Sequence, residues 1–325
     1  MIRKHRSSNF QHRTLNCYAR RSNSRCSALL ILLVIGHSDL VIPITRSLIA
    51  APPTLLRLTD DGHFKQRPAW SPDGKTLVFA RHQGATIMLF LREMNGDERR
   101  LTESKYSEYD AVFSPDGQRL LFSFNKASPN QGDIEVYSIA SDGSDLKPVA
   151  VTRGQLSHEE WPCWSPDGKR IAYTSTRDGN QELYTSLPDG SDERRLTSDP
   201  AIDAHPAWSP DGTRIAFATN RWGDLELATI DPEGKNLTRL TESPGLDDYP
   251  AWSSDGKRLA FTSNRDGNFE IYVAGSDGSQ ATNATSDSAI DNFPTWTPDG
   301  RLTFVSNRDG GFDIFVEAAS EPVLK

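Results

Sequence analysis

The segment Pro206-Ala207-Trp208-Ser209-Pro210-Asp211-Gly212 is one of six copies of a motif that returns along the chain at a nearly constant step. The aromatic residue of the motif stands at Trp70, Phe113, Trp164, Trp208, Trp252 and Trp296. The last four copies are each 44 residues apart. A period in the low forties with several short strands per unit is typical of a four-stranded propeller blade, whereas helical repeats would show apolar residues about 3.6 apart. The sequence therefore predicts six similar blades.

Each unit contains short apolar stretches separated by turn residues. In the fifth unit, strands are predicted over residues 249–253, 258–263 and 269–273. The first break is Ser-Pro-Asp-Gly in most copies, which suits a type I turn because proline presets φ at the second position and glycine fits the fourth. The fourth strand is then the segment that opens the following unit, as in Arg239-Leu240-Thr241. An all-β fold with four strands per blade is expected.

The two ends of the repeat region predict how the ring closes. The sixth unit ends where its fourth strand should begin, and an extra Arg57-Leu58-Thr59 precedes the first motif. We expect the strand from Thr54 to Leu58 to pair with the strand containing Phe312 to Val316, because this pairing hides two strand edges. The alternative, an open stack of blades, would leave both edges exposed. Residues 51–325 are thus predicted to form one closed six-bladed β-propeller.

Residues 1–50 differ from the rest of the chain. Seven Lys and Arg residues, with no acidic residue among them, precede the apolar run 28–35. This pattern predicts a secretory signal, with small-residue cleavage sites at 36–38 or 48–50, and hence a periplasmic or secreted protein. An uncleaved leader that anchors the chain in the membrane is the alternative, although the apolar run is too short for a stable span. Only Cys163 lies in the predicted propeller, so no internal disulfide is expected.

Residues 51–325 are markedly acidic. They hold 28 Lys and Arg residues against 43 Asp and Glu residues, a net charge near −15. Because nucleic acids and anionic membrane surfaces attract basic proteins, both are disfavoured as partners. A monomer that binds a protein or peptide is the expectation.

The repeats resemble a known family. Residues 206–217 (PAWSPDGTRIAF) and 263–272 (SNRDGNFEIY) are similar to the WD40-like repeats of the TolB family of bacterial β-propellers, and the resemblance covers residues 54–325. It implies a propeller that binds other proteins in the cell envelope. Similar blades also occur as non-catalytic domains of tricorn-type and prolyl-oligopeptidase-type proteases, so an accessory propeller of a peptidase system is a second possibility.

One repeated position suggests a binding site. Three residues before the Pro of each motif, or its equivalent, stand Lys65, Glu108, Glu159, Asp203, Asp247 and Asp291. The resemblance implies that this position enters the innermost strand, so these side chains would form an acidic ring near one mouth of the central channel. Such a ring could attract a basic peptide or a cation, with Ca²⁺ as the candidate ion. Alternatively, each carboxylate accepts hydrogen bonds from its own loop.

The motifs favour a non-catalytic binding module over an enzyme. The sequence has no Gly-x-Ser-x-Gly and no His-Glu-x-x-His, and Cys163 lies in a motif strand without an obvious base. A propeller-based hydrolase or polysaccharide lyase is the alternative. His158 and His205, close to Glu159 and Asp203 in adjacent blades, leave a metal site open as a further alternative.

Overall fold

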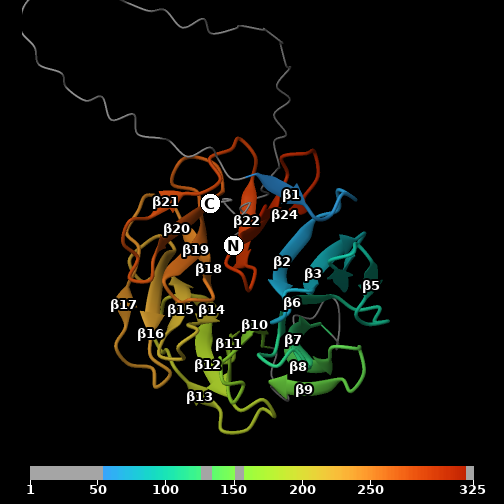
Figure 1. Ribbon diagram of the computed structural model, residues 1–325. Helices are drawn as coiled ribbons and strands as arrows, with labels where there is room; N and C mark the ends of the chain where they lie inside the picture. The colour runs from blue at the N-terminus through green and yellow to red at the C-terminus, as the bar shows by residue number, and fades with distance from the viewer. Residues whose placement is uncertain (1–53, 126–133, 151–156, 320–325) are drawn as a thin grey trace, which may run out of the picture. The chain divides into compact units, whose positions relative to one another are not determined.

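The computed structural model describes residues 54–125, 134–150 and 157–319, and every regular element within them is a β-strand. The strands form six four-stranded antiparallel sheets that are arranged as the blades of a β-propeller (Figure 1). The predicted fold class is therefore confirmed. The predicted leader lies outside the described residues. No helix within the described ranges is long and apolar enough to cross a membrane.

Each blade takes its strands in chain order, apart from the last. Blade 1 consists of β2 (Lys65–Trp70), β3 (Thr76–Gln83), β4 (Thr86–Glu93) and β5 (Glu98–Arg100). Blade 2 consists of β6 (Glu108–Phe113), β7 (Arg119–Phe124), β8 (Glu135–Ala140) and β9 (Lys147–Ala150). Blade 3 consists of β10 (Glu159–Trp164), β11 (Ile171–Ser175), β12 (Glu182–Ser186) and β13 (Arg194–Arg195). Blade 4 consists of β14 (Asp203–Trp208), β15 (Ile215–Thr219), β16 (Glu226–Ile230) and β17 (Thr238–Arg239). Blade 5 consists of β18 (Asp247–Trp252), β19 (Arg258–Ser263), β20 (Glu270–Gly275) and β21 (Thr282–Asn283). Blade 6 consists of β22 (Asp291–Trp296), β23 (Leu302–Ser306), β24 (Asp313–Glu317) and β1 (Leu55–Arg57).

The first strand of each blade is innermost, where it lies against the first strands of the neighbouring blades. The sequence predicted that this strand begins at Tyr249 in the fifth unit, which is two residues too late, because β18 begins at Asp247. The two residues left out of the predicted strand, Asp247 and Asp248, come before a β-bulge in β18. The pairing of β18 with β19 changes register at this bulge, from Asp248 to Ala251. A bulge of this kind occurs in the innermost strand of every blade.

The repeated motif forms the turn and the blade contacts that its sequence predicts. Gly212 donates its N–H to the carbonyl of Ser209 at 2.9 Å, and the Ser209 hydroxyl donates to Asp211 at 2.6 Å. The Trp252 indole donates to the carbonyl of Ala207 in the preceding blade at 3.1 Å. The motif tryptophans thus pack between neighbouring blades, as expected, and bury apolar surface there.

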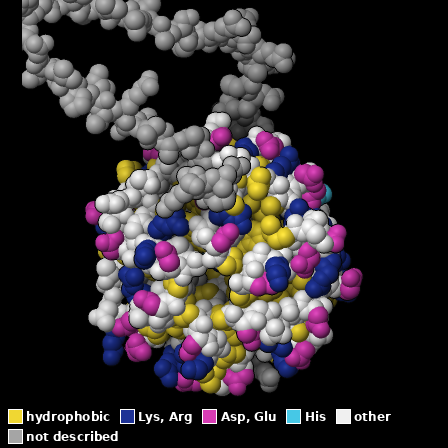
Figure 2. Space-filling model, in the orientation of Figure 1, with side chains coloured by type: hydrophobic (Ala, Val, Ile, Leu, Met, Phe, Trp, Pro, Cys, Tyr) yellow, Lys and Arg dark blue, Asp and Glu magenta, His cyan; other side chains and the backbone are white. Residues whose placement is uncertain are grey.

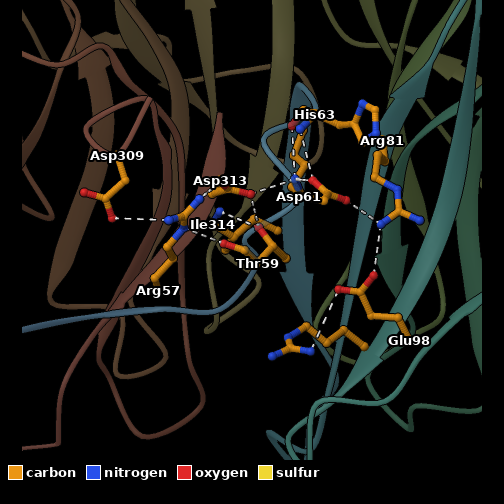
Figure 3. A network of polar contacts seen from close by, with 11 residues as sticks. Arg57, Thr59, Asp61, His63, Arg81, Glu98, Asp309, Asp313 and Ile314 are labelled. Carbon is orange, nitrogen blue, oxygen red and sulfur yellow. Dashed lines mark hydrogen bonds and ion pairs between the residues drawn. The ribbon is translucent and has the colours of Figure 1, made fainter. Parts of the chain in front are cut away.

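Ring closure also follows the prediction. Leu56 pairs with Val316 and Arg57 pairs with Phe315, so that β1 completes the blade formed by the C-terminal strands. A polar network supports this junction (Figure 3). At its centre, the Asp313 carboxylate accepts hydrogen bonds from Arg57 at 2.6 Å, from the Thr59 hydroxyl at 2.8 Å and from Lys65 at 2.8 Å.

Candidate binding site in the central channel

The predicted acidic ring occupies the expected position in the chain. Each of its residues begins the innermost strand of a blade, and each side chain is almost fully buried. Four of the five carboxylates pair with the arginine of their own blade's Arg-x-Gly turn. These pairs are Glu159 with Arg177 (3.4 Å), Asp203 with Arg221 (2.7 Å), Asp247 with Arg265 (2.7 Å) and Asp291 with Arg308 (2.8 Å).

The sequence predicted that these residues converge as an acidic ring at the channel mouth, with hydrogen bonds to each residue's own loop as the alternative. The structure adds that four of the carboxylates have an arginine partner in their own blade. In these four blades the arginine offsets the charge of the carboxylate, so the four groups repel one another less than unpaired carboxylates would. In the described part of the chain, no group of three or more His, Cys, Asp or Glu side chains could hold a metal ion. Ca²⁺, which the sequence suggested as the candidate ion of the ring, has no such group of ligands among these residues.

Lys65 and Glu108 depart from the pattern of the other four positions. Lys65 bridges blades 1 and 6 through Asp313, as described above. Glu108 accepts the Thr102 hydroxyl at 2.6 Å, and burial raises the pKa of its carboxyl to about 7. Its positive neighbour Arg100 and the Thr102 hydrogen bond lower this pKa only in part.

A different set of residues converges on the channel, two positions further along each strand. We call it the channel ring. Its members have positive φ angles between 46° and 59° and stand at the bulge of each innermost strand: Arg67, Asp110, Trp161, His205, Tyr249 and Phe293. Positive φ is costly for side chains of this size, by about 1–3 kcal/mol, and a bulge re-aims the side chain that it carries.

Contacts across the ring show that these side chains meet. The His205 ring lies 4.1 Å from the Trp161 ring and 4.1 Å from the Tyr249 ring, measured between centroids. The Arg67 guanidinium lies 5.6 Å from the Tyr249 ring, although their blades are not neighbours. Because side chains from non-adjacent blades can meet only near the axis, the channel ring narrows the centre of the propeller.

Two cavities adjoin the channel ring. One of about 180 Å³ is lined by aromatic side chains together with Arg67 and Asp110. Another of about 240 Å³ is lined by the Pro and Trp residues of the motif. Tyr249 and Phe293 line both cavities. Figure 2 shows hydrophobic side chains extending across the middle of one face, with many charged side chains around its outline.

Buried polar groups surround the aromatic side chains of the ring. His205 Nδ1 lies 2.6 Å from the carboxylate of Asp248, and its Nε2 has no hydrogen-bond partner among the described residues. Asp110 is 3% exposed, and burial raises its carboxyl pKa to about 6, with Glu160 raising it further and Arg67 opposing the shift. The channel ring thus carries six chemically different side chains at equivalent positions of the six blades.

The other residues singled out in the sequence do not join a reactive centre. His158 Nδ1 lies 3.6 Å from Glu160, so His158 and His205 have separate carboxylate neighbours. Burial raises the pKa of the Cys163 thiol to about 12, which leaves it protonated and unreactive at neutral pH. The channel ring was missed in the sequence, but a signal existed. The residue before each motif Pro, or before Ala111 in the second copy, is a different amino acid in every copy, while the position that follows it is Pro in five of the six copies.

This architecture defines the class of protein: a closed six-bladed β-propeller. A family model described as the TolB β-propeller domain matches residues 155–245 and 235–324, together more than half of the chain. The chain belongs to this family. The fold and the family expected from the repeats are confirmed.

Curated relatives match only parts of the chain. A protein of Agrobacterium fabrum is 29% identical over 122 residues, which cover 36% of this chain and 42% of the relative. A TolB homologue of Chlorobium luteolum is 31% identical over 128 residues, which cover 39% of this chain and 27% of the relative. The chain thus spans less than half the length of these relatives.

Solved structures share the fold. A putative TolB from Agrobacterium tumefaciens has a TM-score of 0.65 at 21% identity, covering 82% of this chain and 97% of that chain. An oligogalacturonate lyase in complex with manganese has a TM-score of 0.56 at 14% identity, covering 84% of this chain and 95% of that chain. Similarity at these identities shows the fold alone, and the fold serves both binding proteins and enzymes.

Proposed function

We propose that this protein is an exported, non-catalytic propeller of the cell envelope that binds a segment of a partner protein at the central channel. The observation that carries this proposal is the channel ring. Blade architecture needs the same residue at equivalent positions, whereas recognition needs different groups in one place. The ring combines aromatic surface, a guanidinium and the buried Asp110 carboxylate at a cavity.

The size of the cavity favours a side chain of a peptide as the bound group. About 180 Å³ is small for a drug-sized ligand but suits one inserted side chain. Aromatic side chains such as Trp161 and Tyr249 provide large contact area at low entropic cost, and they are typical anchors of protein interfaces. Membership in the TolB family and the basic, apolar leader support a location in the envelope.

Selection from a random peptide library displayed on phage tests the proposal. We expect enriched peptides to bind the wild-type protein and to lose at least about tenfold in affinity with Tyr249→Ala, since truncating an aromatic anchor costs about 2 kcal/mol or more. Trp222→Ala is the matched control, because Trp222 is an exposed aromatic in a turn. Peptides that bind independently of Tyr249, or no enrichment at all, would contradict the proposal.

A hydrolase or lyase is the second candidate, and one observation favours it. The His205–Asp248 pair has the geometry of a general base held by a carboxylate. Assays with oligogalacturonate and with simple ester and peptide substrates, for wild type and His205→Gln, separate the two candidates. Turnover that depends on His205 would replace the binding proposal, whereas we expect no turnover.

A further inference from the structure

We propose that the channel ring binds a positively charged side chain, the ammonium of a Lys or the guanidinium of an Arg, inserted by the partner segment beside Asp110. This inference rests on the proposed function and names the chemistry of its ligand. Four features of the ring support it.

The charge balance around the ring is negative. Asp110, Glu160 and Asp248 are all nine-tenths or more buried, and Arg67 is the fixed cation among the ring residues. A second cation would bring this group close to neutrality, and it would do so where water screens the charges poorly.

Asp110 in particular lacks a close counter-charge. Its carboxylate lies 3.5 Å from Arg67 Nε and 3.3 Å from the Ser123 hydroxyl, both long for charge-assisted contacts. Burial raises the pKa of this carboxyl, and the charge of Arg67 offsets the rise only in part. A donor that reaches this carboxylate from the adjoining cavity would supply the short hydrogen bond that it lacks.

His205 offers a second acceptor. In the tautomer in which Nδ1–H donates to the Asp248 carboxylate, the lone pair of the imidazole is on Nε2. This Nε2 is buried and has no partner within the described ranges, and the imidazole lies between Trp161 and Tyr249, which line the cavity. An N–H donor satisfies a lone pair of this kind, whereas an anion would be repelled.

The aromatic walls complete a site for a cation. Tyr109, Trp161, Tyr249 and Phe293 line the cavity of about 180 Å³. Cations are attracted to aromatic faces, and more strongly where water is excluded. Arg67, which lies 5.6 Å from the Tyr249 ring, shows that this wall accepts a guanidinium.

Calorimetric titration of the full purified protein tests the inference, with N-acetyl-arginine amide and N-acetyl-lysine amide as probes. Saturable binding is expected for both. N-acetyl-citrulline amide matches arginine in shape without its charge, and should bind at least about tenfold more weakly. Asp110→Asn should weaken the arginine probe by a similar factor, whereas the exposed Glu103→Gln should not. Thermal melting confirms that each variant is folded.

Three results would overturn the inference. These are equal binding of the citrulline probe, tighter binding of N-acetyl-glutamate amide, and unchanged arginine binding by folded Asp110→Asn. If the free diamine cadaverine bound more tightly than the lysine probe, the site would select a free diamine. This result would contradict the claim that the cation is a side chain of a partner segment. Peptides that need Tyr249 but no basic residue would sink this inference and leave the proposed function standing.

Discussion

The ammonium of Lys65 lies 2.8 Å from the carboxylate of Asp313, and neither side chain has exposed surface. The two residues are 248 positions apart and belong to the first and last blades. Lys65 occupies the position at which every other blade carries a carboxylate. A lysine in place of a carboxylate at this one position therefore forms the ion pair that joins the first and last blades where the ring closes.

Breaking this pair should destabilise the propeller strongly. Lys65→Met leaves Asp313 with fewer counter-charges in a buried site, and removing one partner of a buried pair typically costs about 3–5 kcal/mol. Urea unfolding followed by fluorescence measures the change. Asp309→Asn is the control, because Asp309 is half exposed and 3.7 Å from Arg57, and it should cost at most about 1 kcal/mol. Equal effects of the two substitutions would contradict a role for Lys65 in closure.

The pairs inside the blades should also behave as structural groups. Asp203→Asn removes the charge that holds Arg221 at 2.7 Å, and we expect a loss of about 3 kcal/mol. Glu242→Gln, which breaks an exposed pair with Arg239, should change stability by less than about 1 kcal/mol. Millimolar calcium should leave the Tm of the wild type unchanged. A rise that Asp203→Asn abolishes would support the predicted calcium site instead.

Glu108 should make the stability depend on pH. Its folded-state pKa of about 7 lies above the ordinary value of 4.5. Between about pH 4.5 and pH 7, the Glu108 carboxyl is therefore protonated in the folded protein but ionised in the unfolded chain. Stability contributed by this group is thus full below about pH 4.5 and falls as the pH rises to about 7. Glu108→Gln removes this dependence.

Denaturant unfolding of wild type and Glu108→Gln at several pH values measures the effect. The stability of the variant relative to wild type should rise by on the order of 3 kcal/mol between about pH 4.5 and pH 8. Glu103→Gln, at an almost fully exposed side chain, should follow the wild type throughout. Parallel curves for wild type and Glu108→Gln would show that the folded-state pKa of Glu108 is not raised.

Export is a prediction that rests on the sequence. Expressed in a bacterial host, the chain should be recovered outside the cytoplasm, with a mature N-terminus between about residues 37 and 53. Fractionation followed by mass spectrometry of the N-terminus measures both. An intact leader on protein in the cytoplasm, or uncut protein held tightly in the membrane, would contradict export.

Local and repeated features of the chain could be read in advance. The Ser-Pro-Asp-Gly turn forms within one unit, and the motif tryptophan packs between neighbouring units. Because these features recur, in most copies at a step of 44 residues, each copy predicts the same blade structure. The unpaired segment before the first motif likewise predicts closure, because a strand edge must find a partner. The partners of Asp203 and its equivalents were harder to foresee, since strand position alone does not say whether a carboxylate faces the channel or its own arginine.

The sequence by itself determined the number of blades, their four strands and the closing strand, because these depend on backbone preferences and apolar burial that recur in each unit. Only the tertiary structure decided the site. The bulge turns the residue before each motif Pro toward the axis, and ring closure then brings Arg67 of the first blade to Tyr249 of the fifth, which also contacts His205 of the fourth. Their shared position arises from the geometry of the closed ring, which no single repeat contains.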